Sequence, residues 1–183
     1  MTETSAQAPK PFLYVVVCAA GIASDVSKLI TAAQERGWEV GVIATPLAMG
    51  FFDTDAVEAQ TGRPIRSAWR RPGDPRPFPE PDAVLVAPAT FNTVNKWAAG
   101  IADTLALGTL CEAHGLGVPI AVLPCVGDAL AAHPAYRAST ERLRGMGVRF
   151  ADPYAGGAEQ DGRQGGGRPE FGWERGLELL GTR

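Results

Sequence analysis

Short apolar runs alternate with amphipathic segments along this chain. Five runs rich in Val, Ile, Leu and Ala, the last of them short, predict strands, and the continuous first run predicts burial on both faces. These runs are 12–19, 38–45, 83–88, 118–124 and 148–151. Between them, apolar residues recur every three or four positions, which predicts helices. The helical segments are 21–37, part of 46–62, 92–115, 134–147 and 172–180.

Strands that alternate with helices predict a single α/β domain over residues 1–183. Right-handed crossovers arrange such strands as a three-layer, doubly wound and mostly parallel sheet, which is a Rossmann- or flavodoxin-like fold. Ligands of this fold bind beyond the carboxyl ends of the strands. Four loops with small or hydroxyl-bearing residues fall there, so we expect them to form one site. They are 18–24, 44–48, 88–92 and 123–128.

Three segments stand apart from this alternation. The polar residues 1–11 are expected to form a disordered tail. Segment 63–82 contains six prolines and must be mostly extended, either as a functional loop or as a long crossover. Segment 155–172 is rich in glycine and too polar to pack alone.

Composition narrows the classes of function. The 183 residues carry a formal net charge of −3 and no basic block, which argues against binding nucleic acid. The longest apolar runs are too short to span a bilayer and no signal peptide is visible, so no membrane association and a cytoplasmic location are expected. Three widely spaced cysteines predict reduced thiols, and the presence of only two histidines argues against a metal site.

The strand-end residues leave two interpretations open for each loop. Gly21 and Ser24 either bind a phosphate at a helix start or only form the turn and cap the helix. Thr45 and Phe51 either contact a polar ring such as a flavin or pack into the core. The hydroxyls and amides of 88–105 either bind a ligand or cap and pack their own helix.

PATFNTVNKWAAGIAD, residues 88–103, resembles the pattern P-A-[ST]-x-N-T-x-x-K-x-x-x-G-I-x-D of the homo-oligomeric flavin-containing cysteine decarboxylases. GIAS at 21–24 and T-x-x-A-x-x-F at 45–51 are similar to two other loops of that family. The resemblance covers about residues 12–150 and is closer to the lantibiotic-type, peptidyl-cysteine branch. It implies an FMN site made by Gly21, Ile22, Ala23, Ser24, Thr45, Phe51, Pro88, Ala89, Thr90, Asn92, Thr93, Lys96, Ala102 and Asp103.

The resemblance also implies an activity, which is FMN-dependent oxidative decarboxylation of a C-terminal peptidyl cysteine to an aminoenethiol in ribosomal peptide tailoring. In the family reaction, the flavin oxidises the carbon that bears sulfur and CO₂ then leaves. A homotrimer or homododecamer is implied as well, with the segment around Trp97 and 98–100 suited to the interface. Segment 155–172 corresponds to a flap and is a candidate substrate clamp.

Three departures from the family pattern concern the decarboxylation. No histidine precedes 83–88, where family members carry one. Gly127 stands where the family's asparagine holds the substrate carboxylate, and Phe91 replaces a small residue. The resemblance therefore supports FMN binding by this chain better than it supports decarboxylase activity. An FMN-binding oxidoreductase or a non-catalytic flavin-binding subunit stays the alternative.

Other residues are candidates to take the place of the missing histidine and asparagine, although each of them also suits an ordinary structural or surface role. The candidate catalytic residues are Asp128, Cys125 and His133. The candidate substrate-binding residues are Gly127, Arg163 and Arg168. Further sources of a cation are Arg70, Arg71 and Arg76 in the proline-rich segment.

Overall fold

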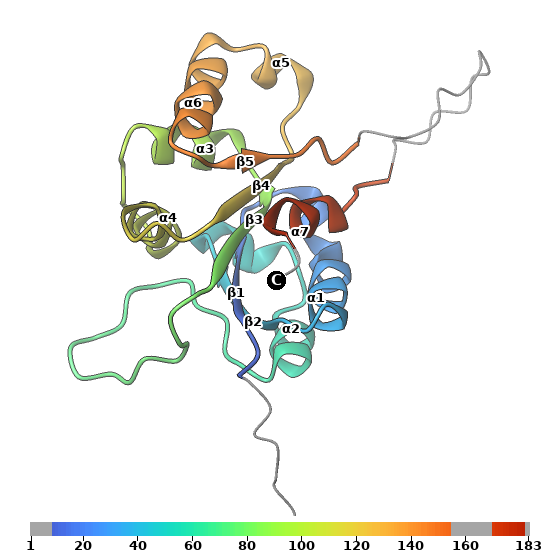
Figure 1. Cartoon of the computed structure of the whole chain (residues 1–183), viewed down its shortest axis with the longest axis vertical. Helices are drawn as coiled ribbons and strands as arrows, with labels where there is room; N and C mark the ends of the chain where they lie inside the picture. Colours follow the sequence, from blue (N-terminus) through green and yellow to red (C-terminus); the bar gives the residue numbers. More distant parts are fainter. Residues whose placement is uncertain (1–8, 155–169, 182–183) are drawn as a thin grey trace, which may run out of the picture.

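The computed structural model describes residues 9–154 and 170–181, which form a parallel five-stranded sheet in the order β2-β1-β3-β4-β5 (Figure 1). The strands are β1 (Phe12–Val17), β2 (Glu39–Ala44), β3 (Ala83–Ala89), β4 (Ile120–Pro124) and β5 (Arg149–Phe150). All pairings are parallel, and Val16 of β1, which lies between β2 and β3, is opposite Ile43 on one side and Val86 on the other. The predicted strands and the doubly wound parallel sheet are confirmed.

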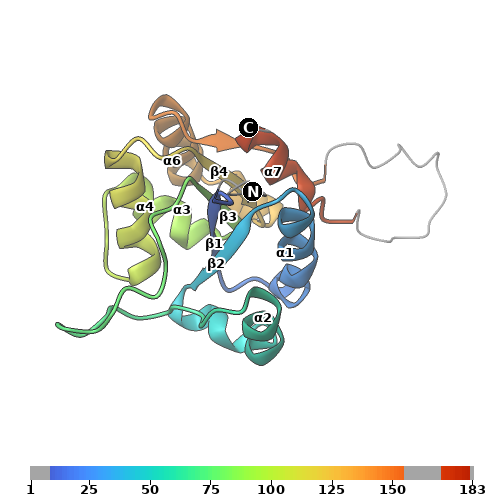
Figure 2. The ribbon, with the colours of Figure 1, turned by 60° about the horizontal axis from the view of Figure 1, so that its bottom comes forward.

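Helices cover both faces of the sheet (Figures 1 and 2). One face carries α3 (Phe91–Ala98), α4 (Leu105–Gly115) and α6 (Pro134–Gly145). The other face carries α1 (Val26–Glu35), α2 (Thr54–Thr61) and α7 (Glu174–Leu180). Three short helices follow strand ends, namely η1 (Gly21–Asp25), η2 (Pro46–Gly50) and α5 (Asp128–Ala131). The strands are apolar on both faces because each face supports its own hydrophobic core.

The prediction of one long helix over 92–115 is wrong, because α3 and α4 are separate. Gly100 has φ +73°, a left-handed conformation that ends α3 and strongly favours glycine. Thr104 then caps α4, since its side chain accepts a hydrogen bond from the N–H of Leu107 at 3.2 Å. The intervening turn brings Asp103 back to Lys96, with Oδ2 and Nζ 2.5 Å apart.

Two residues of the helical layers bear on how the layers pack. Trp97 is only 2% exposed and its side chain belongs to the core, whereas Ala99 and Gly100 after it are exposed, so a subunit contact of this segment stays a prediction for those two residues only. Gly176 of α7 lies so close to the sheet that a Cβ there would be 2.5 Å from Leu85 Cδ1. Close helix-to-sheet contact at α7 therefore depends on a residue without a side chain.

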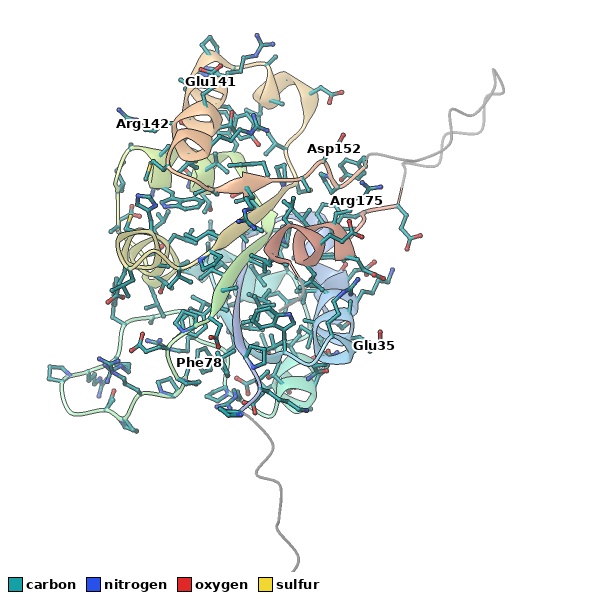
Figure 3. All side chains as sticks on the ribbon, viewed as in Figure 1. Glu35, Phe78, Glu141, Arg142, Asp152 and Arg175 are labelled. Atoms are coloured by element: carbon teal, nitrogen blue, oxygen red, sulfur yellow. The ribbon has the colours of Figure 1, made fainter. Side chains whose placement is uncertain are left out.

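The proline-rich segment 63–82 is a long crossover that begins beside the carboxyl half of β2, where Arg66 bridges to Ile43, and ends at the amino end of β3. Phe78 turns inward against this end of the sheet (Figure 3), and Pro79 O accepts a hydrogen bond from the hydroxyl of Tyr14 at 2.7 Å. Arg70 and Arg76 line a small cavity with Tyr14, at the edge opposite the carboxyl ends. They are therefore not placed to supply a cation to a site at the carboxyl edge.

Two further predictions can be compared with the described residues. Within 9–154 and 170–181, no helix is long and apolar enough to cross a membrane. The cysteines Cys18, Cys111 and Cys125 are free thiols, as their spacing predicted. The predicted tail at 1–11 and flap at 155–172 fall mostly outside the described part of the chain.

Candidate functional site

The sheet has one topological switch point, between β1 and β3. The chain leaves β1 to form β2 on one side and later returns to form β3 on the other. The connections after β1 and β3 therefore diverge, and ligands of open α/β sheets bind in the crevice that this creates at the carboxyl ends. The loops after β1 and β3 are two of the four that the sequence assigned to a site.

A cavity of about 650 Å³ lies at this switch point. Its volume falls within the range of about 300–1,000 Å³ that is typical of small-molecule and cofactor sites. We call it the switch-point cavity. It is lined by Ala19, Ala20, Gly21, Thr45, Pro46, Leu47, Thr90, Phe91, Asn92, Thr93, Lys96, Thr104, Leu107, Cys125, Val126, Gly127 and Leu130.

The lining of the switch-point cavity combines apolar surface with a few polar groups. Thr90 and Thr93 place their hydroxyl oxygens 3.2 Å apart at the start of α3, with either able to donate. Lys96 is the one charged residue among the described lining residues, and its ion pair with Asp103 holds the ammonium group. Such a lining suits an apolar ring system that carries polar edges and a negative charge.

Six of the residues predicted to bind a cofactor line this cavity. They are Gly21, Thr45, Thr90, Asn92, Thr93 and Lys96. They come from the ends of β1, β2 and β3, which shows that three separate loops converge as the sequence predicted. Their roles in cofactor binding stay predictions.

Eight of the predicted residues lie outside the lining. They are Ile22, Ala23, Ser24, Phe51, Pro88, Ala89, Ala102 and Asp103. Ala23 is fully buried and its N–H donates to Ala20 O at 2.9 Å, so this N–H is already used within η1. Ser24 Oγ lies 3.3 Å from Gly21 O, which favours the turn interpretation for this serine. Asp103 instead contacts Lys96, so its effect on the cavity is indirect.

The sequence did not single out several residues that line the cavity. Five of them lie inside the predicted loops, although they were not named as cofactor-binding residues, and they are Ala19, Ala20, Pro46, Leu47 and Val126. Thr104 and Leu107 come from the start of α4, which the prediction of one continuous helix concealed. Leu130 belongs to α5, for which no helix was predicted.

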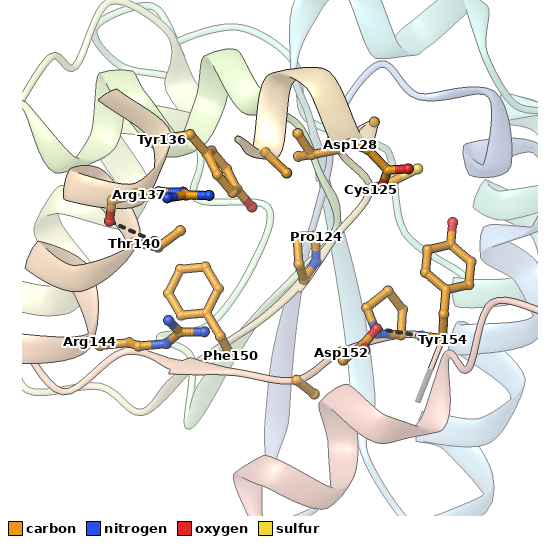
Figure 4. A pocket seen from close by; sticks show the side chains of 15 residues that line it. Pro124, Cys125, Asp128, Tyr136, Arg137, Thr140, Arg144, Phe150, Asp152 and Tyr154 are labelled. Atoms are coloured by element: carbon orange, nitrogen blue, oxygen red, sulfur yellow. Dashed lines mark hydrogen bonds between the residues drawn. The ribbon is translucent and has the colours of Figure 1, made fainter. Parts of the chain in front are cut away.

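A second cavity of about 720 Å³ adjoins the first, because Cys125, Val126 and Gly127 line both. We call it the α6 cavity (Figure 4). Its walls come from the end of β4, from α5 and α6, and from the residues after β5. The side chains that Figure 4 labels are Pro124, Cys125, Asp128, Tyr136, Arg137, Thr140, Arg144, Phe150, Asp152 and Tyr154.

The three candidate catalytic residues have different surroundings. Cys125 is half-buried and lines both cavities, whereas the exposed Asp128 lines only the α6 cavity. His133 lines neither cavity, and its Nδ1 accepts a hydrogen bond from the N–H of Ala135 at 3.1 Å, which caps α6. The candidate substrate residues Arg163 and Arg168 lie outside the described residues.

One thiol near the site is inert by burial. Cys18, at the end of β1, is fully buried beneath Thr90 and Thr93. Burial raises the pKa of the Cys18 thiol, and hydrogen bonds with the two threonines oppose this only in part. Cys18 therefore stays a protonated thiol and acts as a small core residue.

Comparison with known proteins places this geometry in a family. A family model described as Flavoprotein matches residues 1–167. The Coenzyme A biosynthesis bifunctional protein CoaBC of Thermococcus kodakarensis is 39% identical over 74 residues, which are 39% of this chain and 18% of that protein. Phosphopantothenoylcysteine decarboxylase of Mus musculus is 30% identical over 128 residues, covering 67% of this chain and 61% of that protein. The chain thus spans less than two thirds of these curated relatives.

Solved structures show the same fold. The FMN-dependent cysteine decarboxylase SpaF superposes with a TM-score of 0.66 and 26% identity, over 80% of this chain and 86% of that one. MrsD from Bacillus sp. HIL-Y85/54728 gives a TM-score of 0.72 at 18% identity, over 93% and 94% of the two chains, and supports the fold alone. The family match over most of the sequence shows that this chain belongs to the flavoprotein family, as its resemblance to the flavin-containing cysteine decarboxylases predicted.

Proposed function

We propose that this protein binds FMN in the switch-point cavity and oxidatively decarboxylates a cysteine at the C-terminus of a peptide. The observation that carries the proposal is the convergence of Thr45, Thr90, Asn92, Thr93 and Lys96 on one cavity at the switch point. These residues belong to the motifs that resemble the cysteine decarboxylases. SpaF, whose fold this chain shares, is described as an FMN-dependent cysteine decarboxylase.

The donor set of the switch-point cavity fits FMN. The hydroxyls of Thr45, Thr90 and Thr93 supply hydrogen bonds for the polar edges of the ring or for the ribityl chain. Lys96 supplies a positive charge for an anionic cofactor. Leu47 and Leu107 supply apolar surface that excludes water from a bound ring. When bound, FMN accepts the two electrons that the oxidation of the substrate releases.

The rest of the protein's task is to position the substrate. Its sulfur-bearing carbon must lie against the flavin ring at near-contact distance, because small displacements greatly slow such transfers. The α6 cavity opens beside the switch-point cavity and shares the wall at Cys125–Gly127. It therefore offers room for the remainder of a substrate whose thiol end lies over the flavin.

The choice of a peptide substrate rests on the sequence of the glycine-rich segment 155–172, the predicted clamp. The experiment is anaerobic incubation of the purified FMN-loaded protein with peptides that end in cysteine, followed by mass spectrometry. We expect each accepted peptide to lose one CO₂ and two hydrogens, while the visible flavin absorbance bleaches. Peptides with a C-terminal serine are the control and should stay unchanged.

A parallel incubation with phosphopantothenoylcysteine separates the two substrate classes. Conversion of that compound without conversion of any peptide would show that the substrate is phosphopantothenoylcysteine and not a peptide. Unchanged mass for both substrate classes, with no bleaching of the flavin, would contradict decarboxylase activity.

One observation favours a second candidate function, which is flavin binding without decarboxylation. Neither histidine of the chain contributes to the described lining of the switch-point cavity or of the α6 cavity. His133 caps α6, and His114 lines a small depression at the amino end of β4. An oxidoreductase would show bleaching of bound FMN by a nicotinamide donor, whereas a non-catalytic subunit would bind FMN and respond to neither reagent.

We further propose that the protein assembles as a homotrimer or homododecamer in the cytoplasm. Two large apolar side chains that line the switch-point cavity are exposed, with Leu47 79% and Leu130 49% exposed. Apolar side chains grouped at the mouth of a site suit a subunit contact. Light scattering of the purified protein is expected to give a mass of three or twelve chains, and a monomer at micromolar concentration would contradict the assembly.

A further inference from the structure

Tyr136 is a buried side chain whose hydroxyl faces the α6 cavity. It is 8% exposed and lies in the first turn of α6, just after Pro134. Figure 4 shows its hydroxyl directed toward the interior of the cavity, on the side where Pro124 lies. Among the described residues, no hydrogen-bond partner of this hydroxyl is found, and its oxygen is not one of the fully buried unpartnered atoms, so it is open to the cavity and free to bind a ligand.

The ring of Tyr136 is held in place from the switch-point cavity. It stacks on Phe91, with ring centroids 5.8 Å apart and planes inclined by 18°. Phe91 lines the switch-point cavity and also contacts the His133 ring edge-on. Because aromatic stacking restricts the ring, the position of the Tyr136 hydroxyl is fixed relative to the switch-point cavity.

The hydroxyl of Tyr136 is a hydrogen-bond donor at ordinary pH. Burial raises the pKa of Tyr136 above its usual value, and the nearby positive charge of Arg144 opposes this only in part. A protonated phenol donates one hydrogen bond. The only other buried hydroxyl on this wall, that of Thr140, is already engaged, since it donates to Arg137 O at 2.9 Å.

The wall of α6 is also positively charged. Arg137 and Arg144 both line the cavity, and no ion pair of either is found within the described residues. The guanidinium of Arg144 lies over the ring of Phe150, 5.1 Å from its centroid. The acidic residues of the lining, Asp128 and Asp152, lie on the opposite side of the cavity from both arginines (Figure 4).

The loop that follows β4 also lines the cavity, and it has no side-chain donor at position 127. Gly127 stands there, and a Cβ built on it would meet nothing within 4 Å. The resemblance places a carboxylate-binding asparagine at this position. The α6 wall of the cavity thus presents an unpartnered donor and two cations, whereas Gly127, which is followed by the acidic Asp128, contributes no side chain to the lining.

We propose that the hydroxyl of Tyr136, with Arg137 beside it, binds the carboxylate of the substrate cysteine in place of the asparagine that Gly127 lacks. This inference rests on the proposed function, since it assigns the anchor for the same substrate. The substrate then lies along the residues that both cavities share, Cys125–Gly127, with its thiol end toward the switch-point cavity and its carboxylate toward α6. Tyr136 and Arg137 are substrate-positioning residues in this arrangement.

The test compares the affinities of the FMN-loaded protein for N-acetyl-serine and for N-acetyl-serinamide, measured by calorimetric titration. Both probes carry the acylated end of the substrate, neither can be oxidised at sulfur, and only the first has a carboxylate. We expect the acid to bind at least about tenfold more tightly than the amide, as a hydrogen bond to a charged group implies. Tyr136→Phe should remove most of this preference and leave the affinity for the amide within about twofold.

Tyr14→Phe is the matched control. Tyr14 is also buried, and its hydroxyl donates to Pro79 O at the opposite edge of the sheet, so the preference for the acid should persist in this variant. Combining Gly127→Asn with Tyr136→Phe should restore the preference. Equal binding of the two probes by the unmodified protein, or an unchanged preference in Tyr136→Phe, would overturn the proposal.

A further variant is needed because Tyr136 stacks on Phe91, which lines the switch-point cavity, so that changing Tyr136 could also weaken FMN binding. If Tyr136→Phe no longer retains FMN, the same two titrations are made with Arg137→Gln, since Arg137 is exposed and its replacement should leave the core intact. An undiminished preference for the acid in Arg137→Gln would then overturn the proposal. The two proposals fail separately. Tyr136-dependent binding of the acid without decarboxylation of any peptide refutes the proposed function alone, whereas decarboxylation with Tyr136-independent binding refutes the anchor alone.

Discussion

Replacing Gly176 by alanine is expected to lower the free energy of unfolding by about 1–3 kcal/mol. The new Cβ would lie 2.5 Å from Leu85 Cδ1, which is closer than carbon atoms can pack, and 3.1 Å from Leu123 Cγ, which is a tight contact. Both leucines are fully buried in the sheet, so neither can move aside without displacing its neighbours. Urea denaturation of the protein, followed by circular dichroism, measures the change.

Gly145→Ala is the matched control for this prediction. Gly145 also lies in a helix, but a Cβ there would meet nothing within 4 Å and its φ is negative. Alanine restricts the unfolded chain more than glycine does, so this variant should be stabilised by up to about 1 kcal/mol. Equal changes in the two variants would show that helix propensity, and not the contact of α7 with the sheet, decides the outcome.

Replacing Gly21 by leucine is expected to raise the Kd for FMN about 5- to 150-fold, the equivalent of 1–3 kcal/mol of steric overlap. Gly21 follows β1 and lines the switch-point cavity, so a leucine side chain there would occupy space that the cofactor needs. A Cβ at this position meets no protein atom within 4 Å, and the fold itself should therefore be unaffected. Quenching of flavin fluorescence on titration of the FMN-free protein measures the affinity.

Gly50→Leu controls for the general effect of adding a large side chain. Gly50 lies in the short helix η2, and its Cβ position is as open as that of Gly21, but it does not belong to the lining of the switch-point cavity. It should bind FMN with unchanged affinity. Equal FMN affinity of Gly21→Leu and the unmodified protein would show that the flavin lies elsewhere.

The sheet could be predicted from the sequence because the apolar pattern that specifies each strand lies within one short segment. A run such as FLYVVV at 12–17 is apolar at every position, which only a strand covered on both faces can use. Turn and hydroxyl residues directly follow such runs, and two of them, Thr45 and Thr90, line the switch-point cavity. The carboxyl ends of parallel strands share one edge, so the convergence of these loops follows from the fold class.

The remainder of the site depends on contacts that sequence spacing does not encode. Leu107 reaches the cavity because Gly100 interrupts the helical pattern, a break that the apolar periodicity on either side conceals. Ala23 and Ser24 carry a loop motif but lie outside the lining, since a tight 3₁₀ turn uses their polar groups. Local motifs identify the loop, whereas the turn geometry decides which of its residues face the ligand.

The sequence by itself determined the fold class and the flavoprotein family, and it predicted a site at the carboxyl edge, because periodic burial and strand-end residues are properties of short segments. Only the tertiary structure decided that Tyr136 and Phe91 stack across two cavities and that Gly127 faces open space. These residues lie on different elements, and their distances depend on how α3, α5 and α6 pack against one sheet. That packing is a collective result of the whole core, so no local pattern records it.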